Sequence, residues 1–280
     1  MKVIRRSAFA GSFYPSSRQA LTSFVEGAIE RAHIAKEEVE NAYAYQVPHA
    51  GYEYSGDTAA YAYKALSYNS SINKIDTILL VGPNHTGYGM PISVSMLDWE
   101  TPLGVAMNDR ELSEAIAQSK YISIDEEAHR GEHSLEVQLP FMQYLFNKEH
   151  EKKYAFICMG DQSLEASKHL YEAIENAVSK LKRRVVIIAS SDLNHYESAA
   201  SAGIKDAKLL DAIKEIDYEK VNRLISQLDI SACGYGPITV AMMYSQQHGA
   251  KKGVVLDYTN SGRQTGDYSS VVEYSAIAFV

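Results

Sequence analysis

The chain has 280 residues, of which 46% are hydrophobic and 22% charged, as in an ordinary globular protein. Its net charge of -8 argues against nucleic-acid binding, and no apolar run approaches the ~18 residues needed to cross a membrane. The N-terminal residues Met1–Arg6 lack the apolar core of a signal peptide, so we expect a cytoplasmic protein without nucleic-acid or membrane partners. In that reducing compartment, Cys158 and Cys233 are expected to remain free thiols.

Segments typical of strands and helices alternate along the chain. An irregular segment, Ser7–Tyr14, precedes a helix that Ser16 or Ser17 caps and that runs to about Ala35. Strands are predicted over residues 42–47, 78–81, 92–96, 103–106, 154–159, 184–189, 254–258 and 272–280. Helices are predicted over residues 109–119, 163–182, 202–214 and 218–228, and after residues 57, 134 and 237. Without a linker or repeat, this order predicts a single α/β domain over residues 1–280, with a mixed, mostly parallel central sheet and helices on both faces.

Three local features follow from residues at the element boundaries. Ser55 or Asp57 is expected to cap the helix that follows the first predicted strand. The strand over residues 92–96 is expected to pair with the short one over residues 103–106. The polar segment Asp125–Glu132 is predicted to be a surface loop.

Three of the predicted buried strands are followed by turns that contain a histidine, namely His49, His85 and His195. If these strands are parallel neighbours, their carboxyl ends bring the histidines to one crevice. Neutral imidazole is the commonest side-chain metal ligand, and adjacent prolines and glycines favour rigid placement, so we predict a metal site. The alternative is that these are ordinary turn residues. Asp192, in the third turn, can accept the N–H of a liganding histidine or act as a base with His195.

The two cysteines lie in different settings. Cys233 comes directly before a helix, where free amides and the helix dipole favour a thiolate that can bind a metal or attack an electrophile. The alternative for Cys233 is a small apolar residue at a helix start. Cys158 lies inside an apolar strand and is predicted to be a buried, inert thiol.

A further histidine, His133, stands at the start of the helix that Ser134 is expected to cap, and it is expected to face the same crevice. Glu136 follows Ser134 by two positions. It can orient a metal ligand from behind or complete a capping box at this helix start.

Five motifs in this order resemble those of the Memo family. They are Pro48-His49-Ala50-Gly51-Tyr52, Gly82-Pro83-Asn84-His85, Glu132-His133-Ser134-Leu135-Glu136-Val137-Gln138-Leu139-Pro140-Phe141, Ser191-Asp192-Leu193-Asn194-His195-Tyr196, and Cys233-Gly234 with Gly236-Pro237. The resemblance runs from Ala10-Gly11-Ser12-Phe13-Tyr14-Pro15 to the final predicted strand. It implies a fold like that of the class III extradiol (LigB-like) dioxygenases, which hold non-haem Fe(II) with two histidines and a glutamate.

The resemblance also implies a set of site residues. His49 and His85 match the two liganding histidines, and Cys233 takes the place of the carboxylate. Six further residues are placed at the same pocket: His195, Asp192 and His133 in catalytic roles, and Asn84, Glu136 and Tyr52 as lining or supporting residues.

The thiolate is softer than a carboxylate and favours copper(I), zinc or iron. We expect Fe(II) first, with copper or zinc as alternatives, and a small molecule or peptide as ligand. The family resemblance further implies radical-SAM and AMMECR-type proteins as partners. Three functions stay open: a metal-dependent redox enzyme with His195 as proton donor or acceptor, a non-catalytic module that binds a peptide or sequesters a metal, and a zinc hydrolase with a metal-activated water.

Overall fold

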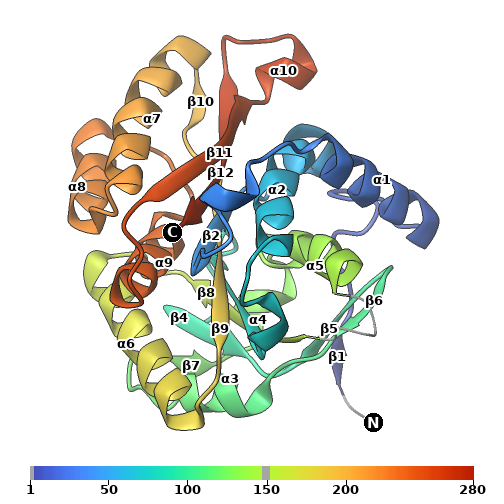
Figure 1. The fold of residues 1–280 in the computed structure, drawn as a ribbon, viewed down its shortest axis with the longest axis vertical. Coiled ribbons are helices and arrows are strands. Elements are labelled where there is room, and N and C mark those ends of the chain that lie inside the picture. Colours follow the sequence, from blue (N-terminus) through green and yellow to red (C-terminus); the bar gives the residue numbers. More distant parts are fainter. Residues whose placement is uncertain (1–2, 147–151) are drawn as a thin grey trace.

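A mixed sheet forms the centre of the molecule, with strand order β10-β12-β2-β9-β3-β8-β4-β7 and β11 paired to β12 (Figure 1). The computed structural model describes residues 3–146 and 152–280. Four neighbouring central strands are parallel: β2 (Ala44–Val47), β9 (Val185–Ser190), β3 (Thr77–Pro83) and β8 (Lys153–Met159). These strands are near-continuous apolar runs because both of their faces are covered. The predicted α/β class is confirmed.

The strands outside this parallel centre are largely antiparallel. β12 (Val271–Phe279) pairs antiparallel with β2, with β10 (His195–Glu197) and with β11 (Gly253–Asn260). On the other side, β4 (Ile92–Ser95) is antiparallel to β8 and parallel to β7 (Ser123–Ile124). The parallel centre therefore has its carboxyl ends on one edge, where a ligand site is expected.

A second, three-stranded sheet lies outside the main one. It contains β1 (Ile4–Arg5), β5 (Asp98–Thr101) and β6 (Gly104–Ala106) in the order β1-β5-β6. The expected pairing of residues 92–96 with residues 103–106 is therefore wrong. The charged residues of β5 conceal its strand character in the sequence, although β5 is the actual antiparallel partner of β6.

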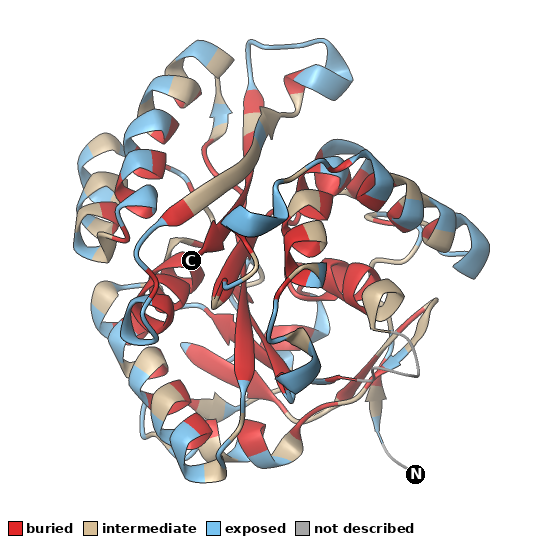
Figure 2. Cartoon of the chain, viewed as in Figure 1, coloured by how far each residue is buried: buried red, intermediate tan, exposed pale blue. Residues whose placement is uncertain are grey.

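Helices cover both faces of the main sheet (Figures 1 and 2). They are α1 (Arg18–Arg31), α2 (Tyr52–Ser67), α3 (Arg110–Ile116), α4 (Glu127–Arg130), α5 (Leu139–Leu145), α6 (Leu164–Leu181), α7 (Ala199–Lys214), α8 (Tyr218–Leu228), α9 (Tyr235–Gln247) and α10 (Gly262–Thr265), with 3-10 turns at Lys36–Glu38, Ile72–Lys74 and Glu136–Gln138. Alternate residues of β3 enter two cores: Leu79 and Val81 pack with α3, α6, α7 and α9, whereas Ile78 and Leu80 pack with α1, α2 and α5. Each such fully buried side chain contributes roughly 1.5–3 kcal/mol.

Side-chain caps define the starts of several helices as the sequence predicts. Ser17 caps α1, Asp109 caps α3 and Ser163 caps α6, and each side chain accepts a hydrogen bond from a backbone amide in the first helical turn. α1 ends at Arg31, earlier than predicted. These caps satisfy amide groups that otherwise lack a partner inside the helix.

The start of α2 differs from the prediction. The helix begins at Tyr52 after Gly51, so the predicted cap by Ser55 or Asp57 is wrong. The Tyr52 N–H donates to the Phe13 carbonyl at 2.8 Å. A contact with the N-terminal segment therefore replaces a side-chain cap, and local sequence carries no signal for it.

The segment Asp125–Glu132 is not the predicted surface loop. It contains α4, and the side chains of His129 and Glu132 are fully buried. Ser134 also departs from its predicted role, because its hydroxyl donates to the Pro83 carbonyl at 2.9 Å instead of capping a helix. A 3-10 turn follows and leads into α5.

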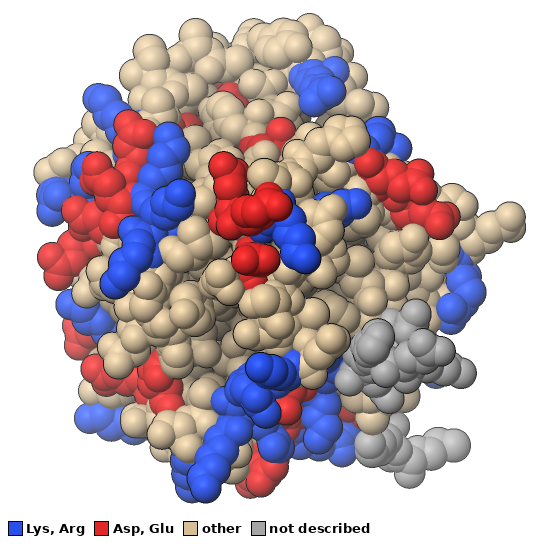
Figure 3. All heavy atoms as spheres, in the orientation of Figure 1, with Lys and Arg blue, Asp and Glu red and all other residues tan. Residues whose placement is uncertain are grey.

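Basic and acidic side chains lie close together on the molecular face shown in Figure 3. On and beside α7 and α8, they form the ion pairs Lys205–Glu197, Lys214–Asp211 and Lys220–Glu215. An exposed pair such as Lys214–Asp211 contributes at most about 1 kcal/mol, whereas Lys205 and Glu197 are partly buried. Within the described ranges, no helix combines the length and the apolar character needed to cross a membrane.

Candidate metal centre

The carboxyl ends of three neighbouring parallel strands deliver the polar residues of this site. His49 follows β2, His85 follows β3 and Asp192 follows β9. Cys233 comes from the turn before α9. The ligand atoms of His49, His85 and Cys233 all lie within 4.8 Å of one another, which is close enough for one ion to contact all three. We call these three residues the donor cluster.

His49 is held by a buried chain of hydrogen bonds that fixes which ring nitrogen carries the proton. The Ser190 hydroxyl donates to the Ser134 carbonyl at 2.7 Å and accepts from Gln138 Nε2 at 2.8 Å. Its only proton is thus committed, so the 2.8 Å contact with His49 Nδ1 requires the imidazole to donate. His49 Nε2 then presents its lone pair to the cluster, 3.1 Å from Cys233 Sγ.

His85 is held in the same tautomer by Glu132, which is fully buried. Glu132 accepts from the His85 backbone amide at 2.6 Å and lies 2.9 Å from His85 Nδ1. Burial opposes ionisation of Glu132, but the hydrogen bond and charge of His85, the charge of His133 and the Ser134 amide together lower its pKa to about 2. Because a carboxylate only accepts, His85 Nδ1 is the donor, and in the neutral ring Nε2 keeps its lone pair.

His133 lies beside both liganding candidates. Its ring stacks on that of His85 with centroids 4.7 Å apart and lies 5.3 Å from the His49 centroid. Burial and the neighbouring His49 lower the pKa of His133 to about 4. A neutral ring at pH 7 can accept or donate a hydrogen bond without adding positive charge next to a metal.

Asp192 and His195 form a second close group with Cys233, and Asp192 Oδ2 also lies 4.0 Å from His49 Nε2. Asp192 accepts from the His49 backbone amide at 2.8 Å, and its own amide donates to Cys233 Sγ at 3.2 Å. Burial raises the pKa of the Asp192 carboxyl. His195 Nδ1 lies 3.0 Å from the Ser231 carbonyl, so Nδ1 donates and Nε2 is left as the acceptor in the neutral ring.

Cys233 approaches the strand ends closely because a glycine follows it. A Cβ on Gly234 would lie only 2.3 Å from the Ser190 carbonyl oxygen. Burial, followed by the charge of Asp192, raises the pKa of the Cys233 thiol well above its usual value. The helix start alone therefore does not ionise this thiol, contrary to the sequence expectation, and a bound cation would be needed to stabilise the thiolate.

Three other predicted pocket residues form hydrogen bonds with the surrounding structure. Asn84 shapes the turn after β3 by accepting from the Thr86 amide at 3.0 Å, and the Tyr52 hydroxyl donates to a backbone carbonyl at 2.6 Å within the core. Glu136 forms no capping box, so that prediction is wrong. Its partners lie instead in the segment that precedes Tyr14 and in Tyr14 itself.

The sequence interpretation missed Glu132, Ser190 and Gln138. Glu132 stands next to His133, a signal that could have been used, but the polar segment before it indicated a surface loop. Ser190 and Gln138 carry no local signal, because their roles arise only when β9 and the turn before α5 meet. Cys158 is buried in β8 as predicted, and both cysteines are free thiols.

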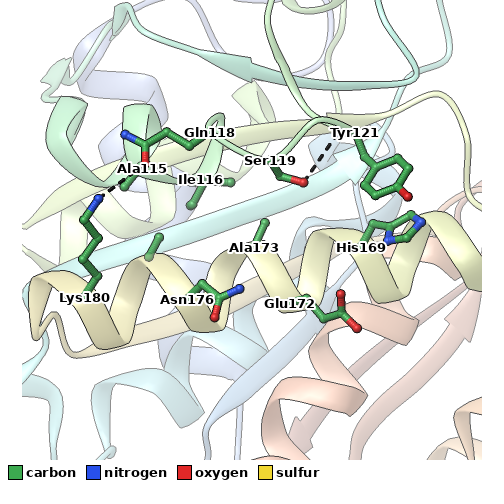
Figure 4. Close-up of a pocket in the computed structure, with 11 residues that line it drawn as sticks. Ala115, Ile116, Gln118, Ser119, Tyr121, His169, Glu172, Ala173, Asn176 and Lys180 are labelled. Carbon is green, nitrogen blue, oxygen red and sulfur yellow. Dashed lines mark hydrogen bonds between the residues drawn. The ribbon is translucent and has the colours of Figure 1, made fainter.

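A separate hollow lies between α3 and α6 (Figure 4). Its volume is about 290 Å³, and its lining includes Gln118, Asn176 and Lys180. Tyr121 and His169 stack at one end of it, with ring centroids 3.4 Å apart. No lining residue that the structure describes belongs to the donor cluster, so the two sites are distinct.

Fold and site together define an α/β protein with a His-His-Cys cluster at the carboxyl ends of its parallel strands. Comparison with known proteins assigns the family: residues 5–278 match the family described as Memo-like protein. The MEMO1 family protein of Methanosarcina barkeri is 41% identical over 274 residues, which is 98% of this chain and 99% of the relative. The relative in Archaeoglobus fulgidus is 42% identical, with 99% of both chains covered, and that in Nitrosopumilus maritimus is 39% identical, with 99% and 100% covered. The chain belongs to the Memo family.

Proposed function

We propose that this protein binds one redox-active metal ion through His49 Nε2, His85 Nε2 and Cys233 Sγ. The observation that carries the proposal is the state of the two imidazoles. Each directs its Nδ1–H to a protein acceptor, Ser190 or Glu132, and thereby keeps an unprotonated Nε2 for a metal. Turn residues that merely occupy surface positions do not require two buried supports of this kind.

The donor set fits iron, copper and zinc. Two neutral imidazoles and one thiolate form a soft-to-intermediate set, and we propose Fe(II) as the resident ion, with copper or zinc as competitors. When bound, an iron or copper ion would supply one-electron chemistry and Lewis acidity at the cluster. Because burial raises the pKa of the Cys233 thiol, the bound cation would have to stabilise its thiolate.

Two residues beside the cluster are suited to moving protons. His195 offers its Nε2 lone pair, since Nδ1 is committed to the Ser231 carbonyl, and it is partly exposed to solvent. Asp192 connects the His49 backbone to the Cys233 sulfur. We propose that His195 takes up or releases a proton at Nε2, and that Asp192 keeps His49 and Cys233 at their mutual distance.

Metal analysis after anaerobic purification tests the binding proposal. We expect one equivalent of iron or copper, or stoichiometric uptake of Fe(II) by the metal-free protein, and loss of uptake in His49→Ala, His85→Ala and Cys233→Ala. His33→Ala, at an exposed histidine, and Cys158→Ala, at the other thiol, are the matched controls. A protein that takes up none of Fe(II), Cu(I) or Zn(II), or equal uptake in cluster and control variants, would overturn it.

The redox part of the proposal needs a separate readout. Electron paramagnetic resonance of the metal-loaded protein should show reversible oxidation and reduction of the bound ion. Stoichiometric binding of Zn(II) alone, with no uptake of iron or copper, would contradict the redox assignment while leaving the donor cluster intact.

A further inference from the structure

The segment of residues 5–14, which we call the strap, forms an aromatic wall beside the donor cluster. The Phe13 ring lies 4.5 Å from that of His133, and the Phe9 ring lies 5.5 Å from His133 and 5.2 Å from Phe13, measured between centroids. His133 in turn stacks on His85. Both phenylalanines pack against the core that contains α1, α2 and α5 but are partly exposed, so part of each ring stays accessible to solvent.

One buried carboxylate holds this strap in place. Glu136 accepts from Arg5 Nη1 at 2.5 Å, from the Ala8 and Phe9 amides at 3.0 and 2.9 Å, and from the Tyr14 hydroxyl at 2.7 Å. Its side chain is completely inaccessible to solvent. Donors from both ends and the middle of the strap therefore converge on a single group, and Glu136 fixes the position of Phe9 directly through the backbone.

Arg5 strengthens the same anchor. Its guanidinium also donates to the His129 and Glu132 carbonyls at 2.7 and 2.9 Å and lies 4.0 Å above the Trp99 ring. Charge-assisted hydrogen bonds of this kind are the stronger class in proteins. At the other end of the strap, the Phe13 carbonyl accepts from the Tyr52 amide, which ties the wall to α2.

The residues around the donor cluster are of two chemical kinds. Phe9 and Phe13 present apolar rings next to His133, whereas Asp192 and His195 present hydrogen-bonding groups next to Cys233. We propose that Phe9 and Phe13 determine specificity by receiving the flat, apolar part of a molecule that binds the metal, and that Glu136 is the residue that positions them. This inference rests on the proposed function, since it assigns the ligand class of the same site.

A matched pair of probes tests the wall. Benzohydroxamate and acetohydroxamate carry the same metal-binding group and differ in a phenyl ring, so their affinities for the metal-loaded protein can be compared by calorimetry. We expect the wild-type protein to prefer benzohydroxamate by about tenfold, the gain that one well-packed aromatic contact supplies. Phe13→Ala should abolish the preference while leaving acetohydroxamate binding unchanged, and Phe13→Leu, which keeps the apolar bulk, should retain part of it.

Glu136→Gln tests the positioning role, with Glu100→Gln as its control, because Glu100 forms an exposed pair with Arg6 on the same strap. We expect Glu136→Gln to reduce the benzohydroxamate preference severalfold and to speed hydrogen exchange of the Ala8 and Phe9 amides in the metal-free protein. Glu100→Gln should change neither.

The outcomes separate the two proposals. An unchanged preference in Phe13→Ala overturns the wall, and unchanged exchange at Ala8 and Phe9 in Glu136→Gln overturns the positioning role even if no metal binds. Failure of the wild-type protein to bind metal or either hydroxamate overturns the proposed function, and the ligand class with it. If Phe13→Ala loses the same affinity for both hydroxamates, the change has damaged the metal site. That result also contradicts the proposal that Phe13 selects for the phenyl ring.

Discussion

Two buried carboxyl groups of this protein, Glu132 and Asp206, have pKa values that are shifted in opposite directions. Glu132 and Asp206 are both fully inaccessible to solvent. The pKa of Glu132 is lowered to about 2 because the donors around it outweigh its burial. Burial and the neighbouring Glu273 raise the pKa of Asp206 to about 7. The Asn194 backbone and Tyr258 offset only part of this increase. Burial alone therefore does not decide the charge of a group in this protein.

The difference lies in the hydrogen-bond donors that each environment supplies. Glu132 lies at the donor cluster and accepts from His85 and from the Ser134 amide. Asp206 of α7 faces Glu273 of β12, and neither Asp206 oxygen forms a hydrogen bond of good geometry with the described residues. The first arrangement holds His85 in place, and the second lowers stability when Asp206 ionises.

The largest effect is expected from Asp206→Asn. The folded state keeps the Asp206 proton up to about pH 7, whereas the unfolded chain releases it near 3.8, so stability conferred by the wild-type residue falls as pH rises through that window. The neutral amide removes this penalty, which is about 4 kcal/mol at most. Urea unfolding should show Asp206→Asn to be more stable at pH 8, with the gap closing toward pH 4. A gap that does not vary with pH would contradict the comparison.

A somewhat smaller effect is expected from Glu132→Gln. The amide offers one acceptor oxygen to three N–H donors and turns its own donors toward them, so His85 loses its fixed orientation. Loss of such a support weakens metal binding by about 10–100-fold. Competition with a chelator measures this affinity, and Glu127→Gln, at an exposed glutamate of α4, serves as the control. Unchanged affinity would show that Glu132 does not support the site.

The smallest effect is expected from Ser190→Ala. This change leaves His49 Nδ1 and Gln138 Nε2 without their shared acceptor, and a neutral hydrogen bond of this kind contributes about 1 kcal/mol, or roughly fivefold in metal affinity. Ser167→Ala is the matched control, because the Ser167 hydroxyl is equally buried but has no hydrogen-bond partner among the described residues. Equal metal affinities in the two variants would show that the Ser190 hydroxyl does not support His49 as a metal ligand.

The positions of the donor residues could be predicted because they depend on strand ends. Apolar runs such as Ile78–Val81 identify buried strands from local pattern, and the turn after each run is then the natural place for His49 or His85. Cys233 lies before a helix and not at a strand end, and its place among the donors is predicted only from the family resemblance. These strand ends are neighbours because the sheet order is β2-β9-β3, and no local sequence pattern predicts that order.

The supporting residues could not be predicted because their roles depend on tertiary contacts. Ser190 is predicted to be a turn residue after the strand over residues 184–189, and nothing local shows its contacts with His49 and Gln138. The local spacing of Glu136 suggests a helix cap, although its partners lie more than 120 positions away in sequence. Asn84 and Tyr52 were assigned to the pocket through family resemblance. Their hydrogen bonds lie in the turn after β3 and in the core, and their role at the pocket stays a prediction.

The central claim is that one ion is held by two imidazoles and the Cys233 sulfur. X-ray absorption spectroscopy of the protein loaded with one equivalent of Zn(II), which this donor set also suits, tests it most directly. We predict one sulfur scatterer at about 2.3 Å together with nitrogen scatterers at about 2.0–2.1 Å, and loss of the sulfur signal in Cys233→Ala. A spectrum with only nitrogen and oxygen neighbours, or a sulfur signal that persists in Cys233→Ala, would contradict the account.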